Sequence, residues 1–113
     1  MGALETSVTA GESGPVVVLS GEADVVSAAR LNELLTAQLT AGAQDLRVDV
    51  SELTFADSAT VRALVLAART LRERHGSLIL IRPQVAVARV LELMGATGLL
   101  VVQGAAEGAE RRP

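Results

Sequence analysis

The sequence predicts an α/β fold: a mixed, mostly parallel sheet of four or five strands, with an N-terminal antiparallel hairpin and about three or four helices. Short aliphatic runs alternate with longer segments of helical spacing, which is typical of strand–helix–strand units in parallel sheets. Two strand-like runs come first, separated only by a Gly-containing turn, and this pattern indicates a hairpin. Half of the 113 residues are hydrophobic, but Phe55 is the only aromatic residue, so the core must be aliphatic.

The predicted hairpin occupies the first segment of the chain. Leu4–Thr9 is an expected edge strand, and Gly11–Gly14 has the composition of a tight turn. Pro15–Ser20 follows as a run rich in Val, which favours a strand. Pro15 would lie at the first residue of that strand, where a missing N–H is tolerated.

The first helix is predicted to begin near Asp24 and to end near Gly42. Asp24 and Ser27 are both of the residue types that cap helix N-termini, and Gly42 is placed to end the helix. Between them, residues on one side recur at helical spacing. These residues are Ala28, Leu31, Leu34, Leu35, Gln38 and Leu39.

Two further helices are predicted in the second half of the chain. The second runs from about Ser58 to His75, and Gly76 supplies its stop. The third runs over Val85–Met94 and ends at Gly95. The apolar face of the second helix consists of Val61, Leu64, Val65, Ala68 and Leu71, and that of the third of Val87, Val90, Leu91 and Met94.

Three more strands complete the predicted sheet. Residues 46–50 alternate between apolar and polar side chains, and we expect a tight bend and a short extended run between them and the second helix. Leu78–Ile81 and Leu99–Val102 are short continuous apolar runs of the kind found in buried strands. We expect residues 1–103 to form a single domain and residues 104–113, rich in Gly, Ala, Glu and Arg, to form a disordered tail.

Composition and motifs argue against several classes of function. The chain has no cysteine, a net charge of −3 and no basic stripe interleaved with aromatic residues, so thiolate metal sites and nucleic-acid binding are not expected. We find no apolar run long enough for a membrane span and no secretion signal, which fits a cytoplasmic location. No phosphate-binding loop is present, and the single histidine, His75, has no partner at metal-ligand spacing. We therefore expect neither an enzyme nor a cofactor or metal.

The pair Asp57-Ser58 lies where the second helix is predicted to begin. Ser and Asp both favour helix N-caps, and the first turn of a helix attracts anions. Three interpretations stay open from the residues alone. Ser58 can be a plain cap, Asp57 can be the cap with Ser58 as the first helical residue, or the Ser58 hydroxyl can be a site where a phosphate is added and removed.

The predicted second helix also has a face directed away from its core stripe. At 100° per residue, Leu66 falls near the middle of that face. A small, partly apolar face that begins at Ser58 is what a protein-docking site would look like, although one exposed leucine is ordinary. The candidate partner-binding residues are Ser58, Ala59, Arg62, Leu66 and Arg69.

Four stretches resemble the STAS family, the sulfate transporter and anti-sigma factor antagonist domain. Asp49–Ala59, D-V-S-E-L-T-F-A-D-S-A, resembles its signature, in which an acid ends a strand and a second acid precedes a serine at a helix start. Leu19–Asp24 resembles its L-x-G-E-x-D segment, Leu78–Pro83 its fourth strand, and Val90–Gly95 its last helix. The resemblance covers about residues 4–103 in the right order, and it implies a STAS fold.

The resemblance implies a bacterial anti-sigma factor antagonist located in the cytoplasm. The expected partner of the unmodified form is an anti-sigma factor, typically a GHKL-type serine kinase, and binding would release a sigma factor. The kinase would phosphorylate Ser58 and a phosphatase would reverse the modification. The residues expected to support this switch are Asp24, Asp49, Asp57 and Thr60, with Asp57 orienting the Ser58 hydroxyl. The protein is expected to be a monomer or a weak dimer.

One departure from the family pattern bears on this function. The family usually has D-S-S-G or D-S-T-G, whereas this chain has Asp57-Ser58-Ala59-Thr60. Ala59 removes the second hydroxyl, which leaves Ser58 as the main acceptor candidate and Thr60 as a weaker one. An alternative function is therefore a STAS interaction subunit that is not phosphorylated, for instance beside a lipid-transport ABC ATPase.

Overall fold

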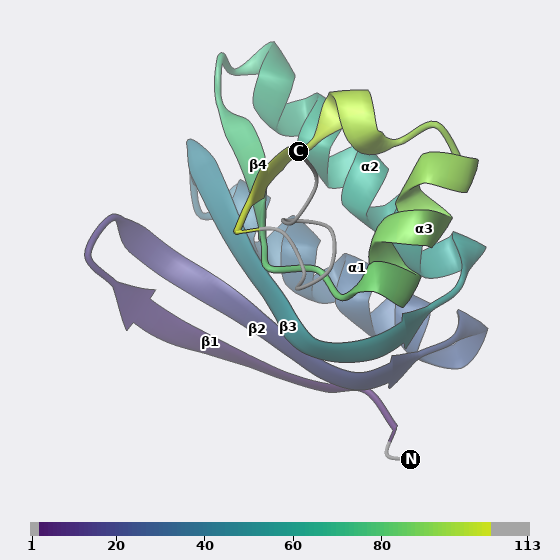
Figure 1. Cartoon of the computed structure of the whole chain (residues 1–113). Coiled ribbons are helices and arrows are strands. Elements are labelled where there is room, and N and C mark those ends of the chain that lie inside the picture. Colours follow the sequence, from purple (N-terminus) through teal and green to yellow (C-terminus); the bar gives the residue numbers. More distant parts are fainter. Residues whose placement is uncertain (1–2, 105–113) are drawn as a thin grey trace.

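The structure, a computed structural model, describes residues 3–104. All of the predicted tail except Gly104 lies outside the described residues. The elements are β1 (Glu5–Gly11), β2 (Gly14–Ala23), α1 (Val25–Thr40), β3 (Asp45–Ala56), α2 (Ser58–Glu73), β4 (Ser77–Ile81), α3 (Val85–Leu93), the 3₁₀ helix η1 (Thr97–Leu99) and β5 (Val101–Gln103). Figure 1 shows their arrangement.

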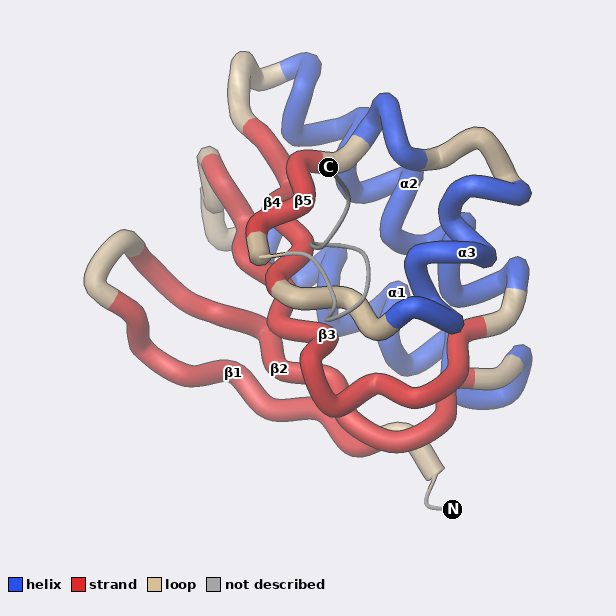
Figure 2. Tube along the Cα trace, viewed as in Figure 1, coloured by secondary structure: helices blue, strands red, loops and turns tan. Residues whose placement is uncertain are grey.

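The five strands form one sheet in the order β1-β2-β3-β4-β5. β1 and β2 are antiparallel, and the other neighbouring strands are parallel. This confirms the predicted mixed sheet with its N-terminal hairpin, and three α-helices lie within the predicted range. Figure 2 separates the strands from the helices and shows α1 and α2 together on one side of the sheet.

One face of the sheet forms the hydrophobic core with the helices. Buried and half-exposed side chains alternate along the central parts of β2, β3 and β4, whereas the three residues of β5 are exposed. The buried sheet residues include Val17, Leu19, Leu46, Val48, Val50, Leu78 and Leu80. They pack in one cluster with Leu31 and Leu35 of α1 and with Val61, Leu64 and Leu71 of α2. The core is aliphatic, as the composition predicts.

The predicted bend after residue 50 is wrong. β3 continues unbroken to Ala56, and the change of direction is a bulge, because the pairing with β2 shifts register between Val18 and Ser20. The Asp49 carboxylate stabilises this bulge by accepting from the Ser51 backbone N–H at 2.9 Å and from the Ser51 hydroxyl at 2.7 Å. Sequence periodicity detects the alternation on either side of a bulge but not the extra residue itself.

The segment between β4 and α3 contacts β3 beyond the point where β4 ends. β4 pairs with β3 only as far as Asp49, so the strand beyond has lost that neighbour. Gln84, which precedes α3, donates its side-chain amide to the Ser51 carbonyl at 2.8 Å. α3 therefore begins against the exposed continuation of β3 and lies next to α2 (Figure 1).

The end of α2 corrects the predicted role of Gly76. The residue in the left-handed conformation is His75, with φ of 64°. The His75 N–H donates to the Arg72 carbonyl and the Gly76 N–H donates to the Leu71 carbonyl. This pair of hydrogen bonds is the Schellman motif, which commonly ends a helix. Gly76 is needed for another reason: a Cβ at that position would collide with the Gln44 carbonyl oxygen.

Two predictions near the C-terminal end of the domain need correction. Leu99 belongs to η1 rather than to the last strand, and β5 is limited to Val101–Gln103. Met94 is not part of the buried side of α3, because 40% of it is exposed. None of the helices within residues 3–104 has the length and apolar character that crossing a membrane requires.

Candidate functional site

Two helices start side by side at the carboxyl ends of neighbouring parallel strands. Ala23 at the end of β2 pairs with Ala56 at the end of β3, and the Asp57 N–H donates to the Ala23 carbonyl at 3.1 Å. Asp24 caps α1 and Asp57 caps α2. The predicted Asp57-Ser58 pair therefore lies at the edge of the sheet where α/β proteins place their functional groups.

Asp57, rather than Ser58, caps α2. One oxygen of its carboxylate accepts from both the Thr60 backbone N–H and the Thr60 hydroxyl, each at 3.0 Å. Of the three interpretations left open by the sequence, this arrangement excludes Ser58 as the cap. It also directs the bonded oxygen of Asp57 to Thr60, and not to the Ser58 hydroxyl that Asp57 was expected to orient.

Thr60 is fully buried, with 0% of its surface exposed. Its hydroxyl is engaged by the Asp57 carboxylate, so another protein cannot reach it in the folded state. The weaker of the two predicted acceptor residues is thus a structural partner of the cap.

Ser58 is the first residue of α2, and its side chain is exposed. Among residues 3–104, the side-chain hydrogen bonds at this helix start join Asp57 to Thr60 and leave the Ser58 hydroxyl out. A neutral hydroxyl is therefore presented to solvent at the positively polarised end of a helix.

The two other acids predicted to support the site lie in different environments. Asp24 forms a capping box with Ser27, and the Ser27 backbone N–H, followed by its hydroxyl, holds the pKa of the Asp24 carboxyl below its ordinary value. Asp24 begins the helix next to that of Ser58, so the structure brings it to the site. Asp49 lies at the bulge of β3, on the order of 20 Å from Ala56 along the strand. The structure does not bring Asp49 to the helix starts.

The predicted docking face of α2 is exposed. Leu66 is 51% exposed, and Arg62 and Arg69 are exposed on the same side of the helix. Ala59 is half-buried near the start of the helix. The face is bounded by a shallow hollow toward α1 and by a deeper groove toward α3.

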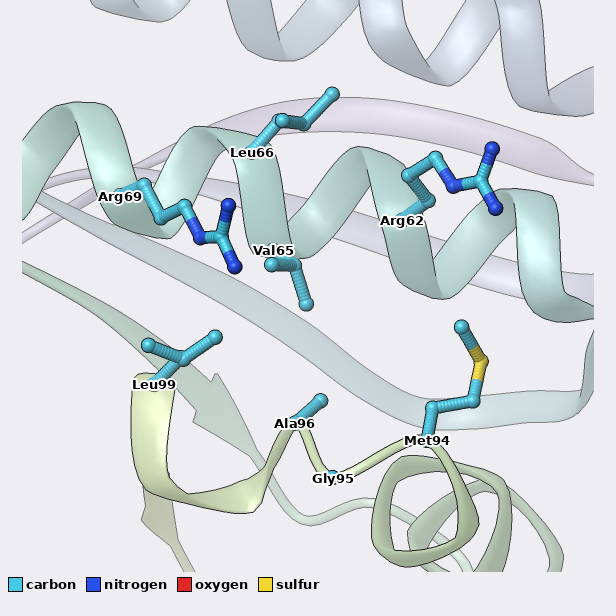
Figure 3. Close-up of a pocket in the computed structure, with 8 residues that line it drawn as sticks. All are labelled: Arg62, Val65, Leu66, Arg69, Met94, Gly95, Ala96 and Leu99. Atoms are coloured by element: carbon cyan, nitrogen blue, oxygen red, sulfur yellow. The ribbon is translucent and has the colours of Figure 1, made fainter.

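The hollow and the groove differ in size and lining. The hollow has a volume of about 230 Å³ and is lined by Ala28, Ala29, Asn32, Ala59, Arg62, Ala63 and Leu66. The groove has a volume of about 320 Å³ and is lined by Arg62, Val65, Leu66, Arg69, Met94, Gly95, Ala96 and Leu99 (Figure 3). Arg62 and Leu66 belong to both, so they form the ridge between them.

Sequence reasoning missed the α3 side of this groove. The residue pattern of α2 cannot predict that Met94 and Leu99 line the groove. Their contribution to the groove depends on how α3 and η1 pack against α2. The available signal was Gly95, because a helix that stops there leaves Met94 at its exposed end. Within residues 3–104, no group of three or more His, Asp or Glu side chains is close enough to hold a metal ion.

Comparison with known proteins identifies relatives over nearly the whole described region. The family model described as "Mlab, STAS domain" matches residues 6–102. A protein of Bordetella bronchiseptica, BtrV, whose name gives it the provisional role of anti-sigma factor antagonist, is 29% identical over 94 residues; the match spans 83% of this chain and 81% of that protein.

Solved structures show the same fold at lower identity. An anti-sigma factor antagonist from Mycobacterium paratuberculosis superposes with a TM-score of 0.78 at 24% identity, covering 88% of this chain and 84% of its own. SpoIIAA in its unphosphorylated form has a TM-score of 0.75 at 21% identity, covering 94% and 92%. The phosphorylated form of Bacillus SpoIIAA gives 0.69 at 20% identity, covering 95% of each chain.

Proposed function

The chain belongs to the STAS domain family, and from this membership we propose that it is an anti-sigma factor antagonist regulated at Ser58. The unmodified protein binds an anti-sigma factor of the GHKL serine-kinase type and thereby releases a sigma factor. Phosphorylation of Ser58 ends the binding, and a phosphatase restores it. The functional unit is the domain of residues 1–103, acting as a monomer or weak dimer, and no catalytic role is assigned to it.

The observation that carries this proposal is the exposed, uncharged Ser58 beside a helix cap that does not use it. A kinase needs an acceptor hydroxyl that it can reach without disturbing the fold. Ser58 meets this requirement, whereas Thr60 is buried and Ala59 has no hydroxyl. The related proteins support the proposal, because BtrV bears the antagonist name and Bacillus SpoIIAA is known in a phosphorylated form.

The physical effect of a phosphate at Ser58 is large enough for a switch. Phosphorylation adds about −1.5 to −2 charges at neutral pH. Like charges brought together at an interface cost several kcal/mol, and each ~1.4 kcal/mol changes an affinity tenfold. A phosphate within the contact can therefore reduce partner binding roughly a hundredfold.

The folded protein can accept this phosphate without unfolding. The first turn of α2 carries a partial positive charge that favours an anion at its start. Asp57 directly precedes Ser58, and Asp24 caps the neighbouring helix, so a phosphate on Ser58 would enlarge an acidic surface at these two helix starts. That acidic surface is what would repel the partner.

A second candidate function is a STAS interaction subunit that is not phosphorylated, for instance beside a lipid-transport ABC ATPase. Ala59 favours it, because it removes one of the two hydroxyls that the family usually presents.

Phosphate mapping separates the two candidates. The protein is incubated with GHKL-type anti-sigma kinases of its own genome and ATP, and the modified residue is located by mass spectrometry. The antagonist function predicts one phosphate on Ser58 that Ser58→Ala abolishes. A partner that binds with no phosphate transferred supports the second candidate. Ser58→Asp tests the binding step, because it should weaken the kinase complex while the thermal transition is retained.

A further inference from the structure

The groove between α2 and the α3–η1 segment combines an apolar floor with two arginines at its rim. Val65 points from α2 toward η1, and Met94 and Leu99 point back toward α2 (Figure 3). Ala96 is buried below them. We propose that this groove binds an amphipathic helical segment of a partner protein that carries acidic residues on either side of an apolar side chain. The inference rests on the proposed function, because it assigns a chemistry to the partner of the same α2 face.

The apolar part of the groove is large enough to receive a side chain. The whole groove, including the space beside the two arginines, has a volume of about 320 Å³, whereas an apolar cavity of ~150 Å³ is sufficient to bind benzene. Met94 at one end is 40% exposed, and Leu66 at the upper rim is 51% exposed. Covering these side chains with an apolar group would remove carbon surface from water, which favours association by roughly 25 cal/mol per Å².

The arginines at the rim are free to bind an external acid. Three other arginines, in the helices or at the end of one, donate to backbone carbonyls: Arg30 to Leu4, Arg72 to Gly98 and the C-cap residue Arg74 to Leu39. Among residues 3–104, no side-chain hydrogen bond engages either Arg62 or Arg69, and both are exposed. A guanidinium binds a carboxylate with two parallel hydrogen bonds, so the chemistry of this rim selects Glu or Asp.

The spacing of the arginines defines the partner further. Arg62 and Arg69 are seven residues apart, so they project from one face of α2 at a separation of about 10 Å. Two acids seven residues apart on a partner helix have the same separation. An apolar side chain halfway between them would face Val65 and Leu99, at the floor of the groove. A helix with this pattern matches the charge and the shape of the groove together.

A peptide assay tests the inference without the kinase or a phosphate. The probe is a synthetic helical peptide with two Glu residues two turns apart and Leu between them on the same face. We expect it to shift the backbone amide NMR signals of α2 and of residues 94–99 in the full-length protein. A matched peptide with Lys in place of both Glu should produce no such shifts.

Variants of the protein locate the contact. Arg62→Glu combined with Arg69→Glu should weaken peptide binding at least about tenfold, and Arg69→Glu alone should weaken it measurably if the double variant does not fold. Arg89→Glu makes the same change of charge as Arg69→Glu alone, at an exposed position of α3 outside the groove, and it should leave the affinity nearly unchanged. Equal binding of the Glu and Lys peptides, signals that shift elsewhere, or no shifts at the highest peptide concentration would each overturn the inference. These outcomes are independent of whether Ser58 is phosphorylated, so the two proposals can fail separately.

Discussion

The carboxylate of Asp57 holds both the backbone N–H and the hydroxyl of Thr60, each at 3.0 Å, and so closes the first turn of α2 beneath Ser58. Asp57 and Thr60, which lie on either side of the Ser58-Ala59 pair, stabilise the start of the helix. The Ser58 hydroxyl therefore takes no part in capping the helix, and it is exposed to solvent, where a phosphate could be added to it. The proposed function therefore separates regulation, at Ser58, from the stability of the helix start, which depends on Asp57 and Thr60.

This division predicts different effects for Asp57→Ala and Ser58→Ala. Asp57→Ala removes the cap and leaves the buried Thr60 hydroxyl without its partner, so the free energy of unfolding should fall by about 1–3 kcal/mol. Ser58→Ala should change it by no more than about 0.5 kcal/mol, as at other exposed sites. Urea denaturation of both variants measures the difference. A loss from Ser58→Ala as large as that from Asp57→Ala would show that the serine shares the capping role.

The capping box of α1 predicts a pH dependence. Hydrogen bonds from Ser27 hold the pKa of the Asp24 carboxyl below its ordinary value of 3.8, so the ionised carboxylate stabilises the folded state. This contribution is fully present above the unfolded-state pKa and is lost as the pH falls through the lower, folded-state pKa. The stability gap between wild type and Asp24→Ala should therefore narrow in acid. Urea titrations at about pH 6 and in steps below about pH 4 measure this gap. A gap that widens in acid would mean that the carboxylate opposes folding.

The C-termini of α2 and α3 both favour glycine, so a substitution to glycine at one and a substitution from glycine at the other should have opposite effects. Both have a left-handed residue after the cap, His75 with φ of 64° and Gly95 with φ of 68°. An L-residue in this conformation costs roughly 1–2 kcal/mol, part of which is offset because glycine makes the unfolded chain more flexible. His75→Gly should therefore stabilise the protein by about 0.5–1 kcal/mol, and Gly95→Ala should destabilise it by a similar amount.

Thermal unfolding measures these two variants with Gly76→Ala as a third. Gly76→Ala should be the most destabilising, because its Cβ would meet the Gln44 backbone oxygen and not open space. A melting temperature that drops for His75→Gly would show that the histidine side chain contributes a contact that outweighs its backbone strain.

The exposed position of Leu66 predicts a change in binding without a change in folding. Leu66→Arg places a charge on the ridge between the hollow and the groove, so it should weaken the complex with the anti-sigma kinase at least about tenfold. Its melting temperature should stay close to that of the wild type, since half of the side chain is already in water. Leu64→Arg is the matched control, because Leu64 is fully buried and the variant should not fold. Intact kinase binding by a folded Leu66→Arg variant would place the docking surface elsewhere.

The sequence allowed the order of elements and the aliphatic core to be predicted, because both depend on local periodicity. It did not reveal the bulge at Asp49, since a bulge changes strand pairing without changing the apolar pattern. It also misassigned Gly76, whose requirement comes from a distant backbone oxygen at Gln44.

The part of the candidate site that lies on one helix could also be predicted from the sequence. Ser58, Arg62, Leu66 and Arg69 share one helix, so a helical wheel places them together. Met94 and Leu99 could not be added to them, because their position depends on the packing of α3 and η1 against α2. The burial of Thr60 could not be predicted either, since a hydroxyl in the first turn of a helix can face either the core or solvent.

The most direct measurement of the central claim compares the affinity of the GHKL-type partner for two forms of the full-length protein, unmodified and carrying phosphoserine incorporated at position 58. Calorimetric titration measures both affinities, and the thermal transition confirms that each form is folded. We expect the phosphorylated form to bind roughly a hundredfold more weakly. Equal affinities of the two folded forms would contradict a charge switch at the start of α2.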